Sequence, residues 1–307
     1  MRALAALLVA LMTAANAMPP APVAEAGAAV QGTFILEGAL VQGGILRGTA
    51  PAGTIGLTLD GKPVALAAGG RFLLGFDRDQ AETATLVAQL AGGGIVREEL
   101  VIAPRAWRIE HVDVARRPSS ATEDYLKRRA AELERIAAAR TIVSTSDGWR
   151  QRFIWPATGR ISGLFGSQRV YRSEPGAYHS GVDVAPGAGA PVVAPADGIV
   201  VLAGPPLFSL EGNLVILDHG MGLNSAFLHL GSMAVHEGQA VRQGEPIGTV
   251  GATGRATGPH LHWSMKWNDA RLDPQALAGA MGAGARAISS QMDPSEDSEI
   301  AAAQRVR

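Results

Sequence analysis

Short β-prone runs separated by glycine and proline fill most of this 307-residue chain, and they constrain the fold more than any other feature. Early examples are TFILEGALV, TIGLTL and TATLVAQL, and later ones are APVVAPADGIVV, NLVILDHG and HLHWSMKW. Valine, isoleucine, threonine and aromatic residues favour strands, whereas glycine and proline favour turns. Asp60-Gly61 between two runs is typical of a β-hairpin turn. The pattern predicts a mainly β protein, with an all-β, sandwich-like domain followed by a small antiparallel-sheet domain.

One segment between the two β-prone regions has a helical pattern instead. Leu126, Leu133 and Ile136 recur at helical spacing, with charged residues on the other faces. Ser120 followed by Glu123 is typical of a capping box at a helix N-terminus. We therefore predict one amphipathic linking helix, whose apolar stripe is buried against one of the β regions.

The first residues have the form of an export signal. Arg2 precedes an apolar run over 3–14, and the sequence at 15–17 has the small-x-small form of a signal-peptidase site. A membrane span needs about 20 apolar residues, so we expect an exported protein with no transmembrane segment after cleavage. The predicted division is a signal peptide at 1–17, a flexible linker at 18–30, an N-terminal β domain at 31–105, a helical linker at 106–150, a second β domain carrying the candidate site at 151–285 and a disordered tail at 286–307.

Composition excludes several kinds of chemistry. The chain contains no cysteine, which excludes disulfides, thiolate metal sites and a cysteine nucleophile. Any metal ligands must therefore be histidine, aspartate or glutamate. A formal net charge of −1 offers no electrostatic reason to expect a nucleic acid as partner.

Six of the seven histidines lie in the second β region, and their spacing points to a metal site. His260 and His262 are two residues apart in a β-prone run, so both imidazoles project from one face. His179 and Asp183 lie four residues apart where another strand begins, so strand alternation would place both on one face. Gly181 between them leaves room for a close approach. Two imidazoles and one carboxylate, with a fourth position open to water, are typical of catalytic zinc. Such an ion lowers the pKa of water toward ~7 and polarises a carbonyl oxygen.

The other histidines have simpler explanations. His229 in NSAFLHLG is the remaining candidate for the site, although a buried, hydrogen-bonded core histidine explains it equally well. We interpret His219 as a turn residue, and His236 and His111 as surface residues.

Three motifs follow one another in the second region: HSGVD at 179–183, FLHL at 227–230 and GPHLH at 258–262. In this order they resemble the lysostaphin-type, or LytM-like, zinc endopeptidases of bacterial cell walls. The resemblance covers about 155–275 and does not extend to the N-terminal β region.

The resemblance implies roles for five residues. It assigns one zinc ion per chain to His179, Asp183 and His262. It places His229 and His260 beside the reacting water and the scissile carbonyl, where either could be the general base and the other could stabilise the oxyanion. It does not separate these two roles.

The resemblance also implies a substrate. We expect an endopeptidase that hydrolyses amide bonds in the stem or cross-bridge peptides of peptidoglycan, in the periplasm, with Asn213, Arg169 and Gln168 lining its groove. Phe227 departs from the family pattern, because many relatives have tyrosine there, and we expect the site to lack one hydroxyl as a result. Two alternatives stay open: a catalytically silent regulator or activator of other wall hydrolases, and a zinc protease acting on soluble peptides.

Overall fold

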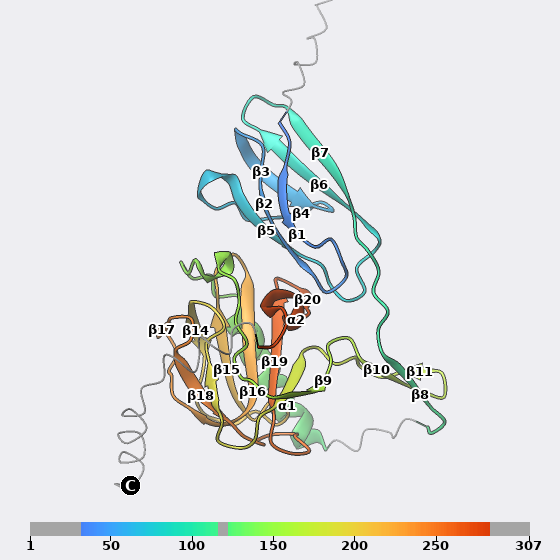
Figure 1. Ribbon diagram of the computed structural model, residues 1–307, viewed down its shortest axis with the longest axis vertical. Coiled ribbons are helices and arrows are strands. Elements are labelled where there is room, and N and C mark those ends of the chain that lie inside the picture. Colours follow the sequence, from blue (N-terminus) through green and yellow to red (C-terminus); the bar gives the residue numbers. More distant parts are fainter. Residues whose placement is uncertain (1–31, 116–121, 283–307) are drawn as a thin grey trace, which may run out of the picture.

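The computed structural model describes residues 32–115 and 122–282. The signal peptide, flexible linker and tail predicted from the sequence lie outside these ranges, as does Ser120. Among the helices that the structure describes, none is long and apolar enough to cross a membrane. The predicted mainly β fold is confirmed, with antiparallel sheets before and after one long helix in the sequence. In Figure 1 this helix lies behind the second β region.

The first β region consists of two sheets, ordered β1-β2-β5 and β4-β3-β6-β7, whose inward residues share one hydrophobic core. Every second residue of β6 is buried, as expected for a sheet with one face against a core. The predicted hairpin is confirmed, since Asp60 and Gly61 connect β3 to β4 with φ of 49° and 77°. The strands are β1 (Ile35–Gly38), β2 (Ile45–Thr49), β3 (Thr54–Leu59), β4 (Lys62–Pro63), β5 (Arg71–Gly75), β6 (Thr83–Leu90) and β7 (Ile95–Val101).

The second β region is a ten-stranded antiparallel sheet with the order β17-β14-β15-β16-β19-β12-β9, joined by β13, β18 and β20. Its bounds are β9 (Arg160–Gly163), β12 (Val182–Ala185), β13 (Pro191–Val193), β14 (Gly198–Leu202), β15 (Asn213–Asp218), β16 (Leu223–Met233), β17 (Ala240–Val241), β18 (Pro246–Val250), β19 (Leu261–Trp267) and β20 (Ala270–Leu272), followed by helix α2 (Pro274–Ala278). The central strands β15, β16 and β19 are almost wholly buried, which makes them a rigid support for side chains at their ends.

A small third sheet joins the two regions. It contains β8 (Ile109–Val112), β10 (Gln168–Tyr171) and β11 (Glu174–Pro175), and β8 pairs with β10 in parallel. Chain that leaves the first β region thus forms one edge of this small sheet, which projects from the right of the second β region in Figure 1. The regions also touch directly, because β5 packs against β19 and β20, and Arg105 forms an ion pair of 2.8 Å with Asp273.

Helix α1 (Glu123–Arg140) confirms the predicted linking helix, but two details were wrong. Its N-cap is Thr122, whose hydroxyl accepts a hydrogen bond from the Tyr125 backbone. Leu126 and Leu133 are 56% and 49% exposed, so the expected apolar stripe is not buried. Only the last turns pack on β14 and β15 through apolar side chains. The preceding turns contact the loop between β14 and β15 through charged side chains, Arg129 on Glu211 and Glu132 on Ser209.

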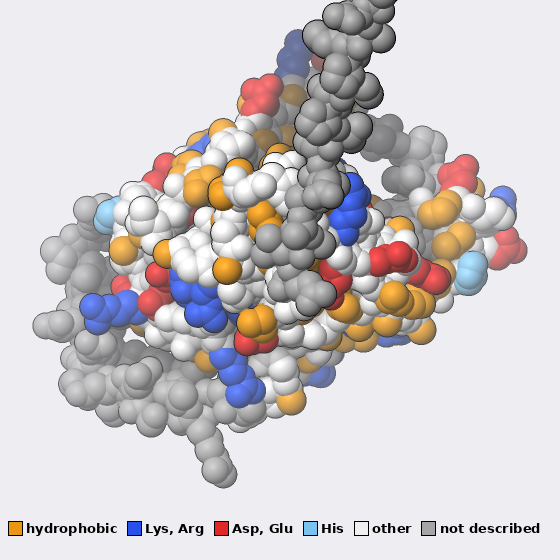
Figure 2. All heavy atoms as spheres, turned by 90° about the horizontal axis from the view of Figure 1, so that it is seen from above, with side chains coloured by type: hydrophobic (Ala, Val, Ile, Leu, Met, Phe, Trp, Pro, Cys, Tyr) orange, Lys and Arg blue, Asp and Glu red, His pale blue; other side chains and the backbone are white. Residues whose placement is uncertain are grey.

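Both signs of charge are scattered over the face of the molecule that Figure 2 shows. This agrees with the near-zero net charge of the chain. A distribution of this kind provides no extended positive surface on that face for the phosphates of a nucleic acid.

Candidate metal and catalytic site

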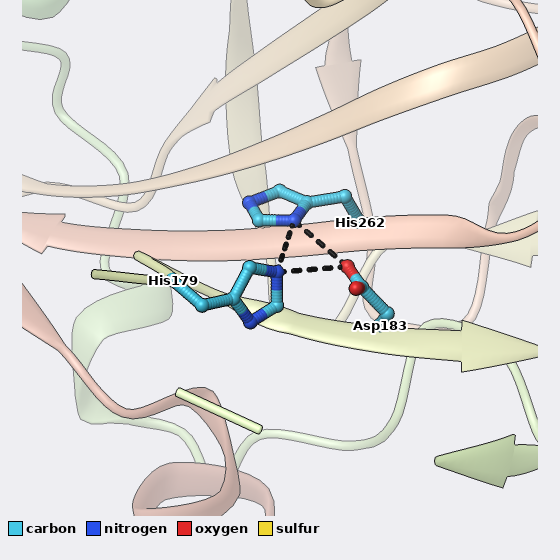
Figure 3. A group of neighbouring side chains, drawn as sticks. All are labelled: His179, Asp183 and His262. Atoms are coloured by element: carbon cyan, nitrogen blue, oxygen red, sulfur yellow. Dashed lines mark hydrogen bonds and ion pairs between the residues drawn. The ribbon is translucent and has the colours of Figure 1, made fainter. Parts of the chain in front are cut away.

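Three side chains converge where β12 and β19 run side by side (Figure 3). Asp183 on β12 lies directly opposite His262 on β19, so both side chains project from the same face. Asp183 Oδ1 is 2.8 Å from His262 Nδ1 and 3.1 Å from His179 Nε2. The two ring nitrogens are 3.0 Å apart. The structure therefore brings together all three residues that were assigned as ligands.

A loop rather than a strand positions His179. We expected His179 and Asp183 to share a face through strand alternation, but β12 begins only at Val182. Instead, the His179 backbone N–H donates to the Ser167 carbonyl at 2.8 Å, and its ring Nδ1 lies 3.0 Å from the Leu164 carbonyl. Because a carbonyl only accepts, Nδ1 carries a proton. Nε2 shares its own proton with Asp183 in this cluster and must lose it before its lone pair can bind a metal.

The cluster holds a charged carboxylate among imidazoles. Burial opposes ionisation of Asp183, but hydrogen bonds from His179 and His262 outweigh it and hold the pKa of the carboxyl well below its ordinary value. Burial lowers the pKa of His262 and favours its neutral form. Burial also acts to lower the pKa of His179, but its hydrogen bond to Asp183 outweighs this and raises it. An ionised carboxylate is thus available as a ligand at neutral pH.

The donor atoms and their spacing fit a zinc ion. Zinc binds imidazole nitrogen and carboxylate oxygen at about 2.0–2.2 Å, so atoms on one tetrahedral ion lie about 3.3 Å apart. The three donors here, 2.8–3.1 Å apart, need little separation to reach that spacing. Gly181 lies so close that an added Cβ would be 2.7 Å from His262 Nε2, and a Cβ on Gly163 would collide with Asp183 Oδ2. The close approach predicted at Gly181 is confirmed.

Two further histidines flank the cluster. His229 on β16 and His260, just before β19, have ring centroids 4.9 Å apart, and His260 Nε2 lies 3.8 Å from Asp183 Oδ1. Each ring donates from Nδ1 to a backbone carbonyl, His229 to Thr253 at 2.9 Å and His260 to Gly258 at 2.8 Å. Each Nε2 is consequently left with a lone pair that can accept a proton.

A distortion of β16 directs His229. The pairing register with β15 shifts between Asn213 and Val215, and His229 has a φ of 63°, which is uncommon for a residue with a side chain. Bulges of this kind re-aim a side chain. His229 is buried, as expected if it were a core histidine, but its ring packs against that of His260. Burial lowers its pKa, so the ring is neutral near pH 7.

A groove of ≈1320 Å³ opens beside the cluster. Residues of β8, β9 and β10 line it, and His179 and Asp183 lie at its margin. An open groove bordered by strands suits an extended chain better than a small molecule.

The three residues expected in this groove differ in position. Gln168 and Arg169 line it, whereas Asn213 is not among its lining residues. The Asn213 amide donates to the Leu230 carbonyl at 3.0 Å and thus stabilises the start of β15. Arg169 is exposed and paired with Glu110 at 2.8 Å.

Phe227 does not leave the site short of a hydroxyl, and our expectation about it was wrong. Its side chain is fully buried in the hydrophobic core, opposite Trp263 in the strand register. His262 pairs instead with Leu228, on the other face of the sheet. A tyrosine hydroxyl at position 227 would therefore point into the core.

His219 stabilises the fold and lies away from the cluster. It is fully buried, with Nε2 2.8 Å from the Ser225 hydroxyl and Nδ1 2.8 Å from the Asp197 carbonyl. Burial lowers the pKa of His219 to about 4. This agrees with its interpretation as a structural turn residue.

The His219 environment predicts an acid-sensitive fold. The unfolded chain binds a proton near the ordinary pKa of 6.5 and the folded chain only near 4, so folding stability falls as pH drops through this window. Between about pH 7 and about pH 4.5 we expect wild type to lose roughly 2–3 kcal/mol more than His219→Gln, which cannot titrate. Urea unfolding of both proteins in chelator measures this difference. Equal losses in the two proteins would show that folding does not lower the pKa of His219.

Thr253 is a residue of the site that sequence reasoning missed. Its carbonyl accepts from His229, and its hydroxyl accepts from the Asn213 backbone at 2.9 Å and donates to the Leu230 carbonyl at 2.9 Å. Thr253 lies in the glycine-rich run GATGRATG, where no local pattern indicates which residue faces a distant strand.

Comparisons with known proteins agree with this geometry. The family model described as Peptidase family M23 matches residues 177–274. The DD-carboxypeptidase/endopeptidase Mpg of Neisseria meningitidis is 40% identical over 123 residues, which are 39% of this chain and 27% of that protein. The peptidoglycan DD-endopeptidase ShyA of Vibrio cholerae is 38% identical over 116 residues, 38% of this chain and 26% of ShyA. The cell division protein DipM of Caulobacter vibrioides is 37% identical over 131 residues, 43% of this chain and 20% of DipM.

A solved structure extends the similarity beyond the family-model range. It is a crystal structure from Pseudomonas aeruginosa assigned to peptidase M23, with 32% identity and a TM-score of 0.59. The alignment covers 78% of this chain and 95% of that one. By contrast, this chain spans about a quarter of the length of the curated relatives it matches.

Proposed function

We propose that this chain, which belongs to peptidase family M23, is a zinc-dependent endopeptidase that hydrolyses amide bonds in the stem or cross-bridge peptides of peptidoglycan. The observation that carries the proposal is the convergence of His179, Asp183 and His262 at mutual distances of 2.8–3.1 Å. Two more histidines stand beside that cluster. The names of the relatives Mpg and ShyA support the substrate.

The ligands in this proposal are His179 through Nε2, His262 through Nδ1 and the Asp183 carboxylate. Bound there, one zinc ion would supply Lewis-acid polarisation of the scissile carbonyl and lower the pKa of water. The Leu164 carbonyl fixes the His179 ring by accepting from Nδ1, an outer contact that orients a ligand before the metal binds.

His229 and His260 carry the proton transfers in this proposal. In the neutral ring the proton is on Nδ1, which donates to a backbone carbonyl, so Nε2 is the nitrogen that can accept a proton. One ring accepts a proton from the attacking water and passes it to the leaving amine. The other ring, in its imidazolium form, donates a hydrogen bond from Nε2 to the oxyanion. The short distance between the rings lets both act on one reacting centre, and either assignment of the two roles fits it.

The substrate in this proposal lies along the groove beside β8, β9 and β10. Peptidoglycan lies outside the cytoplasmic membrane, and the signal-like N-terminus of the sequence is consistent with export. We accordingly propose the periplasm as the site of action. The alternative of a catalytically silent regulator is less favoured, because all five metal and proton-transfer residues are present.

Digestion of purified sacculi tests the proposed function. We expect the mature protein to release peptidoglycan fragments whose stem or cross-bridge peptides have been cut, identified by mass spectrometry, and expect chelator to abolish the release until zinc is restored. Zinc-replete protein that cleaves soluble peptides but leaves sacculi intact would support the soluble-peptide alternative. Activity that persists in chelator would contradict a metal mechanism.

A further inference from the structure

We propose that Arg129 on helix α1 is a positioning residue for His229, acting through Glu211. The helix lies outside the family-model range of 177–274, so the resemblance assigns it no part in the reaction. The proposal rests on the proposed function, because it takes His229 to be a proton-transfer group. Its structural step, the placement of the His229 backbone, can be tested without any activity measurement.

The polar face of α1 holds the loop between β14 and β15 at several points. Arg129 makes two hydrogen bonds to the Glu211 carboxylate, at 2.6 and 2.7 Å. Glu132 accepts from both the backbone and the hydroxyl of Ser209, at 2.9 and 2.6 Å. Arg135 donates to the Pro205 carbonyl at 3.0 Å. The charged residues of α1, and not the apolar stripe that was expected to be buried, therefore bind this loop.

The same loop supports the distorted segment of β16. The Glu211 carbonyl accepts the His229 backbone N–H at 2.8 Å. At the neighbouring residue, the Leu210 carbonyl accepts from the Arg255 backbone at 3.0 Å. A non-glycine residue with φ of 63° is strained and persists only where surrounding contacts enforce it. For His229 those contacts are the Glu211 carbonyl on the backbone and the Thr253 carbonyl on the ring.

The Arg129–Glu211 pair differs from an ordinary surface ion pair. Both side chains are 15% exposed, and the guanidinium engages both carboxylate oxygens, which gives a rigid and directional contact. Hydrogen bonding to Glu211 raises the pKa of Arg129 above its ordinary value, against the opposing effect of burial. The pair can therefore restrain the backbone of Glu211, whose carbonyl accepts the His229 N–H.

Other contacts should keep the loop folded when Arg129 is removed. Phe208 is buried against Ala139 and the sheet, and Glu132 retains its two bonds to Ser209. Arg129 also donates to Glu132 at 3.0 Å, so Arg129→Ala removes one contact of Glu132 as well. Glu211→Gln keeps that contact and changes the end of the loop at Glu211 alone. This makes a positioning effect separable from loss of the fold.

The test compares Arg129→Ala and Glu211→Gln with Arg128→Ala, a control on the exposed neighbouring position of the same helix. We expect Arg129→Ala to lower kcat about 10- to 100-fold on a peptidoglycan fragment, with KM and zinc content close to wild type, as for residues that orient a catalytic group. Arg129→Lys should retain part of the kcat that Arg129→Ala loses. The double variant that combines Arg129→Ala with Glu211→Gln should lose no more kcat than the stronger of the two single variants. Arg128→Ala should behave as wild type.

Hydrogen exchange of the His229 amide, followed by NMR, provides the readout that does not depend on activity. We expect exchange at least about tenfold faster in Arg129→Ala and unchanged in Arg128→Ala, while core amides of β15 and β19 keep their protection. An unaltered His229 amide together with unaltered kcat would overturn the proposal. So would a uniform loss of protection with a lower Tm, because it would indicate a purely structural role. An inactive wild type with the expected exchange pattern would instead refute the proposed function and leave the positioning of His229 intact.

Discussion

Alanine at His179 or Asp183 is expected to reduce the zinc content from about one ion per chain to near zero. The open site has only three protein ligands, so the loss of one leaves two. Neighbouring residues that are not ligands cannot replace the lost one. Wall-digesting activity should fall with the metal, to the level of the chelated protein. Elemental analysis of purified protein measures zinc directly.

The control for metal content is His236→Ala, which removes an exposed imidazole that is not part of the cluster. It should keep its zinc and its activity. Variants that retained a full complement of zinc without His179 and without Asp183 would contradict the ligand assignment. His262→Ala provides a third check, with the same expected loss.

Alanine at His229 or His260 is expected to have the opposite pattern, with zinc retained and activity lost. General acid–base groups typically contribute about 10² to 10⁴ in rate, so we expect a decrease of that size in kcat. Neither ring is within hydrogen-bond distance of the Asp183 carboxylate, since His260 Nε2 lies 3.8 Å from Oδ1, so the ligand cluster should survive both changes. Parallel measurements of zinc and fragment release decide the outcome.

The two histidines of the His-x-His motif provide the sharpest comparison. Zinc loss in His260→Ala together with retention in His262→Ala would reverse the assignment within the pair. The two proton-transfer roles separate in the pH dependence of kcat/KM, because the variant that lacks the base should lose the acidic limb of the profile. If both variants kept full activity, neither histidine would be a proton-transfer group.

Local chemistry explains why much of the site could be predicted. His262 and Asp183 lie in runs whose β propensity is strong, and directions of side chains within a strand follow from alternation alone. The glycine at 181 signals close approach, which the structure explains by its contact with His262. The hairpin at Asp60-Gly61 follows in the same way from turn chemistry.

Long-range contacts explain what could not be predicted. The stripe of α1 suggested burial of Leu126 and Leu133, but Arg129 and Glu132 form the contact instead, because their partners in the loop are the carboxylate of Glu211 and the hydroxyl of Ser209. No local sequence pattern indicates that Arg129 pairs with Glu211, because the two residues are 82 positions apart. The direction of the residue at 227 likewise depends on which face of the sheet became the core.

By itself, the sequence determined the mainly β class, the linking helix, and the residue types able to bind a metal, because these depend on contacts within a few positions. Only the tertiary structure decided that Asp183 faces His262 across two strands, that the loop at 164–167 presents His179, and that a bulge turns His229 toward His260. The physical reason is the same in each instance. Strand register, loop path and bulge position minimise the free energy of the whole packed sheet, so no local stretch of residues encodes them alone.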